Sequence, residues 1–138
     1  MFASIECTGA ALAELLRAAR AEAPREFAAV LGGRVCDGSA DVRRVLRLPN
    51  RADDHTSFEV DAVAFARCEH ELRKTGDTFL GFAHSHPNGS TAPSVRDREQ
   101  LWTDCVQVIT DGYTWQAFVL DAARLVHPLA TTGQEQLS

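Results

Sequence analysis

The sequence predicts a mixed α/β domain, in which helices pack on the outside of a central sheet. Hydrophobic residues alternate, or run together, in several segments of strand length, and other segments carry them at helical spacing. These two kinds of segment are interspersed along the chain, which is typical of one layered α/β architecture. The 138 residues suffice for one domain with its own core, so we expect a single domain over residues 1–138.

Composition narrows the classes of partner. Hydrophobic residues make up 45% and charged residues 24% of the chain, which are ordinary globular values. The net charge of −5 argues against a nucleic-acid binder. Arg43, Arg44 and Arg47 form a local basic cluster, which we interpret as a solvated strand face or a contact for an acidic protein.

The cellular location is predicted from the lack of an export signal and of a membrane-spanning run in the sequence. The N-terminus does not have the pattern of a signal peptide, and no apolar run reaches membrane-spanning length. The four cysteines are scattered and are interpreted as reduced, mostly buried thiols. We therefore expect a cytoplasmic protein without membrane contact.

The first predicted elements are a strand and a helix. Residues 2–7 alternate loosely and indicate a strand. Thr8 is a good N-cap for a helix that runs to about Ala23, where Pro24 breaks it. The residues expected to face the core from this helix are Leu12, Leu15, Leu16 and Ala19.

Two strands follow the first helix. Residues 27–31 form an apolar run that we expect to end at the glycines of positions 32–33. Glu26 lies at the entry to this strand, where an ordinary solvated carboxylate is the simpler alternative to a functional one. Residues 41–48 alternate apolar residues with arginines and predict a strand with one wet face.

A polar loop and a second helix come next. Residues 50–60 are polar up to Phe58 and contain His55, for which an exposed loop position is favoured over a role in support of a functional site or in contact with a substrate. Asp61 caps a helix that runs to Lys74, and Gly76 marks its exit. His70 is expected on the outer side of this helix, and the residues expected inside are Val63, Phe65, Ala66, Cys68 and Leu72.

The C-terminal part predicts a hairpin. Residues 105–109 and 115–120 alternate on either side of Asp111-Gly112, a good turn sequence. Residues 125–129 can add an edge strand. Residues 130–138 are polar, and we expect them to be a frayed tail.

The segment over 78–97 carries the candidate chemistry. Residues 78–83 form an apolar strand, and His84 and His86 are two apart at its end, so their side chains project from the same face. A proline and turn residues follow. Ser94 then caps a short helix to about residue 102, and Asp97 lies in its first turn.

This arrangement predicts a zinc site formed by His84, His86 and Asp97. Two nitrogens and one carboxylate oxygen suit zinc, and three protein ligands leave a fourth position for water, which is the pattern of catalytic sites. The simpler alternatives are a surface His-x-His pair and an ordinary helix-start acid. A catalytic thiol at Cys68 or Cys105 is disfavoured, because neither has a nearby histidine and acid arrangement of the sort that an activated cysteine needs.

The same residues resemble the signature of the JAMM metalloproteases, the active MPN domains. The signature is His-Ser/Thr-His-Pro, six residues, Ser, two residues and Asp, and residues 84–97 contain every position of it. Residues 24–33, PREFAAVLGG, are similar to the segment that carries the glutamate of the family. Many prokaryotic members have Cys-Gly where this chain has Ala28-Ala29, which leaves the subfamily open.

The resemblance implies a curved, mixed sheet flanked by helices, with one zinc ion per chain at the strand ends. It implies that Glu26 is the general base and that Ser94 stabilises the oxyanion. The implied substrate is a ubiquitin-like or sulfur-carrier protein, joined through its C-terminal glycine to a lysine, a cysteine or another group. The identity of the carrier, the bond cleaved, the oligomeric state and any activating partner stay open.

The sequence lacks the motifs of two other classes of zinc enzyme. A zinc nucleotide deaminase needs His/Cys-x-Glu with Pro-Cys-x-x-Cys, and a zincin needs His-Glu-x-x-His, and the sequence contains neither set. A non-catalytic MPN scaffold, which binds partners and typically lacks some of the metal ligands, is the alternative from a different class.

Overall fold

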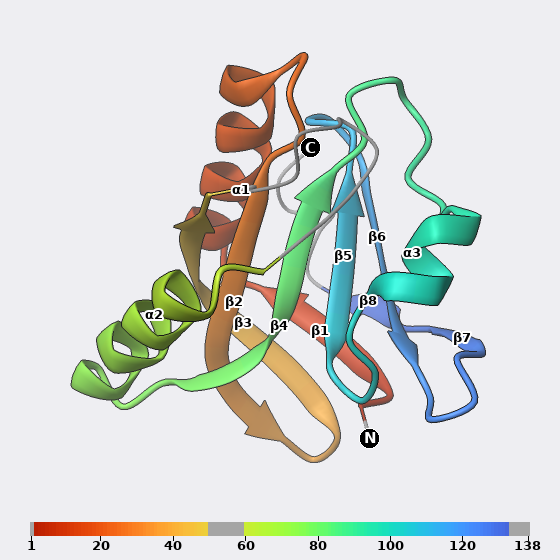
Figure 1. The fold of residues 1–138 in the computed structure, drawn as a ribbon. Helices are drawn as coiled ribbons and strands as arrows, with labels where there is room; N and C mark the ends of the chain where they lie inside the picture. The colour runs from red at the N-terminus through yellow and green to blue at the C-terminus, as the bar shows by residue number, and fades with distance from the viewer. Residues whose placement is uncertain (1, 50–59, 133–138) are drawn as a thin grey trace.

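The computed structural model describes residues 2–49 and 60–132, which form one eight-stranded sheet with three helices (Figure 1). The helices are α1 (Gly9–Glu22), α2 (Ala62–Lys74) and α3 (Val95–Gln100). The strands are β1 (Ser4–Cys7), β2 (Ala28–Cys36), β3 (Ser39–Leu48), β4 (Thr78–Ser85), β5 (Val106–Thr110), β6 (Trp115–Leu120), β7 (Val126–Pro128) and β8 (Ala130–Thr132). Among the described residues, no helix is long and apolar enough to cross a membrane.

The sheet is mixed and has the order β7-β6-β5-β4-β2-β3-β1-β8. Strand β4 lies in the middle, antiparallel to β2 and parallel to β5. The C-terminal ends of β4 and β5 therefore lie at the same end of the sheet, the upper end in Figure 1. The predicted fold class, a mixed sheet with helices outside it, is confirmed.

The two edges of the sheet are connected by the end of the described chain. Val126–Pro128 pairs with β6, and Ala130–Thr132 pairs in parallel with β1. Between them, Leu129 N donates to Ala117 O at 2.9 Å. The prediction that the frayed tail begins at residue 130 is therefore wrong for the first three residues, because β1 offers a strand edge that polar residues can pair with. Residues 133–138 lie outside the described part.

Each face of the sheet has its own hydrophobic cluster. Helix α1 packs on one face against residues such as Ala29, Leu31 and Ala83. Helix α2 packs on the other face against Ala28, Val30 and Phe82. The alternation along β2 and β4 assigns residues to faces, so His84, two residues after Phe82, lies on the face of α2.

The two long helices begin at the predicted caps. Thr8 Oγ1 accepts a hydrogen bond from Ala11 N at 3.1 Å, and Asp61 Oδ1 accepts one from Val63 N at 2.9 Å. The prediction for the buried face of α2 is partly wrong, because only Cys68 and Leu72 are buried. Val63 is 63% exposed, Ala66 is exposed and Phe65 is half-buried, because α2 contacts the sheet through a narrow stripe. In α1, Leu16 is also only half-buried.

The glycines at 32–33 do not end β2, contrary to the prediction. The strand continues to Cys36, with a shift of register at this point. A Cβ on Gly33 would lie 1.9 Å from Asp41 O, and one on Gly32 would lie 2.2 Å from a methyl carbon of Leu72. These glycines allow the close approach of β3 and α2, which a sequence cannot distinguish from a strand terminus.

Gly81→Ala is expected to lower the free energy of unfolding by about 3 kcal/mol. A Cβ at this position would lie 1.8 Å from Val106 O, so β4 and β5 could not keep their present separation. Urea denaturation measures the loss. Gly9→Ala, at the exposed start of α1, is the control and should change stability by less than about 1 kcal/mol. Equal stability of both variants would contradict the close approach.

Candidate metal centre

The two histidines are positioned by the end of β4. His84 is 1% exposed and lies between Ala28 on β2 and Ile109 on β5. His86 follows the last residue of β4, and its N donates to Thr110 O at 2.8 Å, which extends the contact with β5 by one residue. The extended backbone therefore continues through His86, and both rings come to one face, as the spacing predicts.

The loop after β4 orients the second histidine. His86 Nδ1 lies 2.9 Å from Ser90 O. Because a carbonyl oxygen can only accept, His86 Nδ1 carries the hydrogen in this contact. In the neutral ring, Nε2 then has a free lone pair, which is the form that binds a metal.

Helix α3 delivers the carboxylate. Ser94 Oγ accepts a hydrogen bond from Asp97 N at 3.0 Å, and Asp97 Oδ2 accepts one from Ser94 N at 2.9 Å. This reciprocal pair is a capping box, here closed by an aspartate. It begins the helix and holds Asp97, which is buried, with its carboxylate toward the histidines. The helix covers Val95–Gln100, slightly shorter than predicted.

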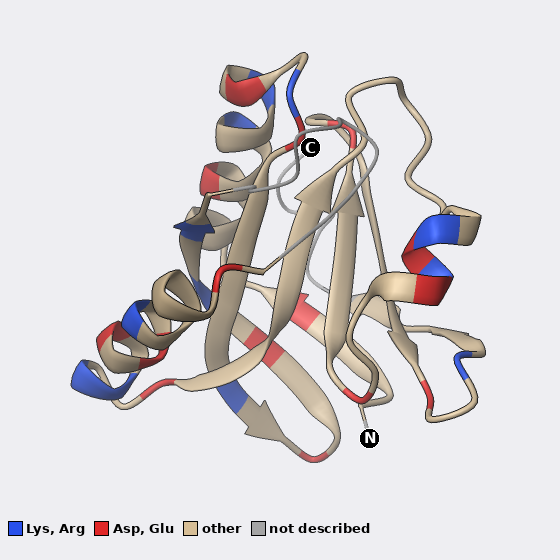
Figure 2. Ribbon diagram, viewed as in Figure 1, with Lys and Arg blue, Asp and Glu red and all other residues tan. Residues whose placement is uncertain are grey.

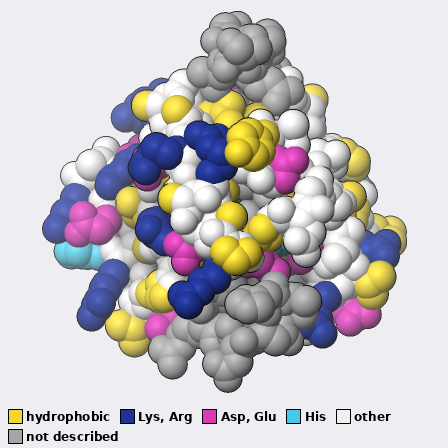
Figure 3. Space-filling model, turned by 90° about the horizontal axis from the view of Figure 1, so that it is seen from above, with side chains coloured by type: hydrophobic (Ala, Val, Ile, Leu, Met, Phe, Trp, Pro, Cys, Tyr) yellow, Lys and Arg dark blue, Asp and Glu magenta, His cyan; other side chains and the backbone are white. Residues whose placement is uncertain are grey.

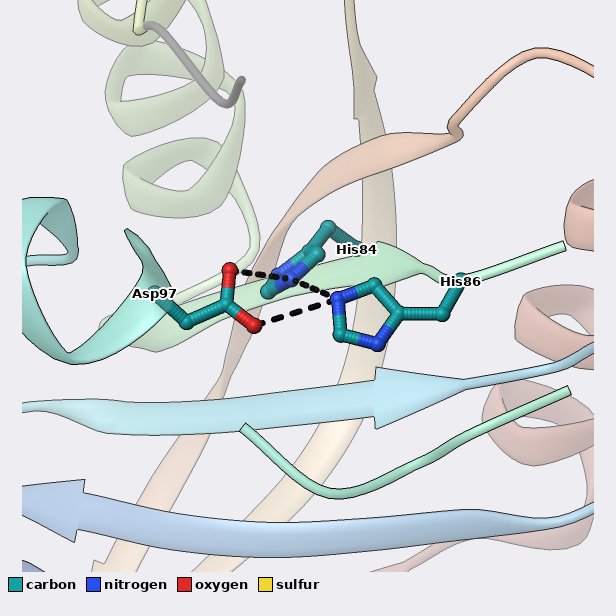
Figure 4. Close-up of side chains that lie close together, drawn as sticks. All are labelled: His84, His86 and Asp97. Carbon is teal, nitrogen blue, oxygen red and sulfur yellow. Dashed lines mark hydrogen bonds and ion pairs between the residues drawn. The ribbon is translucent and has the colours of Figure 1, made fainter. Parts of the chain in front are cut away.

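The three side chains converge on one point (Figure 4). His84 Nε2 lies 3.2 Å from Asp97 Oδ1, and His86 Nε2 lies 3.1 Å from Asp97 Oδ2. The two Nε2 atoms are 3.2 Å apart. Ligands at about 2.0–2.2 Å from a tetrahedral zinc lie about 3.3–3.6 Å from one another. The observed spacing thus fits zinc after a small outward shift.

The charges also fit a cation. His86 Nε2 and the Asp97 carboxylate are both acceptors when the ring is neutral, so a proton or a metal ion has to lie between them. Burial raises the pKa of Asp97, but hydrogen bonds from His84 and His86 outweigh it and hold that pKa well below the usual range. The hydrogen bond to Asp97 raises the pKa of His86, and burial opposes that rise. The group therefore favours positive charge at its centre.

Glu26 lies near this group without belonging to it. It precedes β2, is half-buried, and is not one of the residues whose ligand atoms lie within 4.8 Å of one another. The pKa of His86 is raised mainly by the hydrogen bond to Asp97, and burial opposes this rise. The contact with Ser90 O and, last, the negative charge of Glu26 also raise this pKa. Glu26 therefore contributes negative charge to the surroundings of His86 without being one of the three converging residues.

The central strands β4 and β5 beside the group carry no charged side chains and are largely apolar. Strands β4, β5 and β6 contain no Lys, Arg, Asp or Glu, and charge lies mostly on the helices and loops (Figure 2). Phe82 packs against Trp102 with ring centroids 4.8 Å apart, and Trp102 packs against Phe65 at 5.2 Å. Trp102 is 42% exposed, so this aromatic cluster leaves some apolar surface on the side of the sheet that carries Phe82 and His84.

Comparison with known proteins assigns the family. Residues 8–125 match the family of prokaryotic homologs of the JAB domain. The chain belongs to this family. The JAB-domain match covers both the Glu26 segment and the histidine segment, and the resemblance to the JAMM/MPN proteins is confirmed.

One relative of this JAB domain is described as a probable TtuB-protein conjugate cleaving protease of Thermus thermophilus. It is 36% identical over 111 residues, which are 78% of this chain and 68% of the relative. A solution structure of a protein from Desulfitobacterium hafniense is 26% identical, with a TM-score of 0.83, over 92% of this chain and 90% of that one.

A crystal structure of a JAB1/MPN domain protein from Archaeoglobus fulgidus shows the same fold. It is 21% identical, with a TM-score of 0.55, over 93% of this chain and 97% of that one. Ala28 and Ala29, which stand where many prokaryotic members have Cys-Gly, lie in β2. Ala28 lies directly opposite His84 on the neighbouring strand, so the variable position adjoins a candidate ligand.

Other residues singled out in the sequence are not among the three converging side chains of the JAB-domain site. His70 is exposed on α2, as predicted, whereas His55 lies outside the described residues. Within the described part, the basic cluster contacts its own chain. Arg43 pairs with Asp41, Arg47 pairs with Glu22, and Arg44 donates to Glu71 O and to Thr75 Oγ1. These contacts favour a solvated strand face.

The cysteines do not form a nucleophilic site. Burial raises the pKa of Cys105 to about 12 despite a hydrogen bond from Gln107, and burial also raises the pKa of Cys68. Thiols with raised pKa values are poor nucleophiles. The expectation of mostly buried thiols is half correct, since Cys7 is half-buried and Cys36 is exposed.

Two contributions were missed by sequence reasoning. The motif gives Ser85 no role of its own, yet Phe27 N donates to its hydroxyl at 2.7 Å. Its place between two histidines of one face could have indicated that its side chain contacts the other side. The carbonyl of Ser90 has no side-chain signal at all, because any residue provides a backbone oxygen.

If Ser94 stabilises the oxyanion, as the family resemblance implies, Ser94→Ala should leave zinc bound and slow turnover by about 10² to 10³. Ser94 Oγ accepts from Asp97 N, so its own hydrogen remains available for donation to a substrate oxygen. The free energy of unfolding should fall by about 1 kcal/mol with the cap. Kinetics and urea denaturation separate the two roles. Full activity at reduced stability would make Ser94 a cap alone.

Proposed function

We propose that this chain is a zinc-dependent hydrolase that cleaves the bond after the C-terminal glycine of a ubiquitin-like or sulfur-carrier protein conjugate. The observation that carries the proposal is the convergence of His84, His86 and Asp97 at 3.1–3.2 Å. Three ligands leave a position for water or substrate, which distinguishes a catalytic site from a structural one.

Each residue of the site has one proposed role. When bound, zinc supplies Lewis acidity, which polarises a carbonyl and lowers the pKa of a water ligand. His84, His86 and Asp97 hold it, one ion per chain. Glu26 accepts the proton of the attacking water and returns it to the leaving group. Ser94 donates a hydrogen bond to the substrate oxygen as negative charge develops on it.

A protein conjugate is the substrate class that the surroundings support. The relative from Thermus thermophilus is named for the cleavage of TtuB-protein conjugates. Figure 3 looks down on the end of the sheet at which β4 and β5 terminate, and there hydrophobic, basic, acidic and uncharged side chains are mixed. Such a surface suits a protein better than a nucleic acid, which favours a basic face.

A non-catalytic scaffold is the less supported alternative. A scaffold has no need for a buried carboxylate held against two histidines, since such an arrangement is costly without a cation. The remaining expectations stay predictions: one domain over residues 1–138, a location in the cytoplasm and no contact with membrane or nucleic acid.

The decisive assay uses a conjugate of defined linkage. A sulfur-carrier protein is joined through its C-terminal glycine to a lysine peptide in one sample and to a cysteine adduct in another. The zinc-loaded protein should release the carrier with a free C-terminal glycine, identified by mass spectrometry. Products from only one sample would identify the bond. Binding without any cleavage of either conjugate would favour the scaffold.

A further inference from the structure

Ser85 lies between the two candidate ligands and is buried, with 1% of its surface exposed. Its Oγ accepts a hydrogen bond from Phe27 N at 2.7 Å, and its N donates to Phe27 O at 2.9 Å. Phe27 follows Glu26 directly in the chain. The residue between the histidines is therefore bonded twice to the residue after the candidate base.

These two bonds are not a regular ladder. In an antiparallel pair, two opposite residues exchange N–H···O=C bonds in both directions. The register places Phe27 opposite Ser85, because Ala28 pairs with His84. One bond is the ordinary backbone bond, whereas the returning bond goes to the Ser85 hydroxyl. The Ser85 side chain, in addition to the backbone, thus fixes the position of Phe27 directly before β2.

The position of Glu26 depends on how Phe27, the next residue in the chain, is held directly before β2. Phe27 is 1% exposed and belongs to the cluster beneath α1, and the Arg47 guanidinium lies 5.8 Å from the centre of its ring. The side chain of Phe27 and its two bonds to Ser85 fix the peptide that Glu26 precedes. On the other side of Ser85 in the chain is His86, one of the three candidate ligands.

We infer that Ser85 is a positioning residue that holds the Glu26 carboxylate at working distance from the metal ligands. The expected loss of turnover rests on the proposed function, in which Glu26 is the base. The positioning itself rests on the hydrogen bond from Phe27 N to Ser85 Oγ. Proton transfer needs the base within hydrogen-bond reach, and a displacement of about 1 Å can cost on the order of 10² in rate. Without the hydroxyl, Phe27 N loses its buried acceptor, and the entry to β2 can shift.

The test compares the wild type with Ser85→Ala and Ser85→Thr, each loaded with zinc. Ser85→Ala should keep its zinc and a KM within about twofold, while kcat falls by about 10- to 100-fold. Ser85→Thr keeps the hydroxyl and should restore most of kcat. Hydrogen exchange of the Phe27 amide, measured by NMR, should accelerate in Ser85→Ala and stay slow in Ser85→Thr.

Thr8→Ala is the matched control for stability. It also removes one hydroxyl that accepts from an amide, here Ala11 N, but at the far end of α1 from Glu26. The melting temperature should fall in both Thr8→Ala and Ser85→Ala. Only Ser85→Ala should lose kcat, which separates positioning from general destabilisation.

The outcomes distinguish the inference from the proposed function. A wild-type kcat in Ser85→Ala would overturn the inference, and so would a loss of zinc, which would show that Ser85 positions the ligands instead. If the wild type cleaves no conjugate, the proposed function fails. Crystal structures of the zinc-loaded wild type and Ser85→Ala then decide: a displaced Glu26 carboxylate supports the positioning role, and an unmoved one overturns it.

Discussion

Glu26→Gln should retain one zinc per chain and lose turnover by about 10² to 10⁴, the usual effect of removing a general base. The glutamine keeps the size of the side chain and much of its hydrogen bonding, so folding and metal binding should be preserved. The backbone of Phe27 remains bonded to Ser85 in this variant, because neither bond involves the Glu26 side chain. The loss therefore reports on proton transfer.

The inactive Glu26→Gln protein should also still bind its conjugate, which makes it a trap for the natural substrate. Glu22→Gln is the matched control. Glu22 lies four residues earlier, at the end of α1, and pairs with Arg47 on the surface at 2.6 Å. The Glu22→Gln protein should keep wild-type turnover. A Glu26→Gln protein that hydrolyses a proven substrate at the wild-type rate, with zinc bound, would leave Glu26 as an ordinary carboxylate.

Removal of a candidate ligand should abolish both zinc binding and activity. His84→Ala takes away a buried nitrogen that lies 3.2 Å from the other two donors. Two remaining ligands bind zinc poorly, since catalytic sites use three from the protein. Elemental analysis of the purified protein should give close to one zinc per chain for the wild type and almost none for the variant.

Asp97→Asn is the more informative change at the third ligand, because it tests the role of Asp97 in metal binding separately from its role in the helix cap. An amide oxygen can still accept from Ser94 N, so the capping box and α3 should persist, while the charge that balances zinc is lost. Asp97→Ala should lose the cap as well, at about 1 kcal/mol. His70→Ala, on the exposed side of α2, is the control for histidine loss. Undiminished zinc in both His84→Ala and Asp97→Asn would show that the ligands are others.

The parts of the fold and site that sequence could predict are those with a strong local signal. Thr8 and Asp61 cap their helices where the sequence places them, because a cap depends on a few adjacent residues. The convergence of His84 and His86 follows from the period of two in a strand. Asp97 follows from its place three residues after a cap, which gives the capping box that was observed.

The parts that were mispredicted depend on contacts between distant segments. Gly32 and Gly33 lie inside β2 because β3 and α2 approach them closely, and nothing near them in the sequence announces those neighbours. Ala130–Thr132 forms a strand because β1 is open to pairing, not because of its own residues. The hydroxyl of Ser85 replaces a backbone acceptor, which only the register of β2 on β4 reveals.

The proposed hydrolysis of carrier-protein conjugates requires a zinc ion held by His84, His86 and Asp97. The most direct measurement is the rate of conjugate cleavage as zinc is added back to protein that a chelator has stripped of metal. The stripped protein should be folded and inactive, because the ligands lie on preformed strand and helix ends, and the rate should rise with zinc to a plateau at one ion per chain. Cleavage by the metal-free protein at the wild-type rate would contradict this requirement.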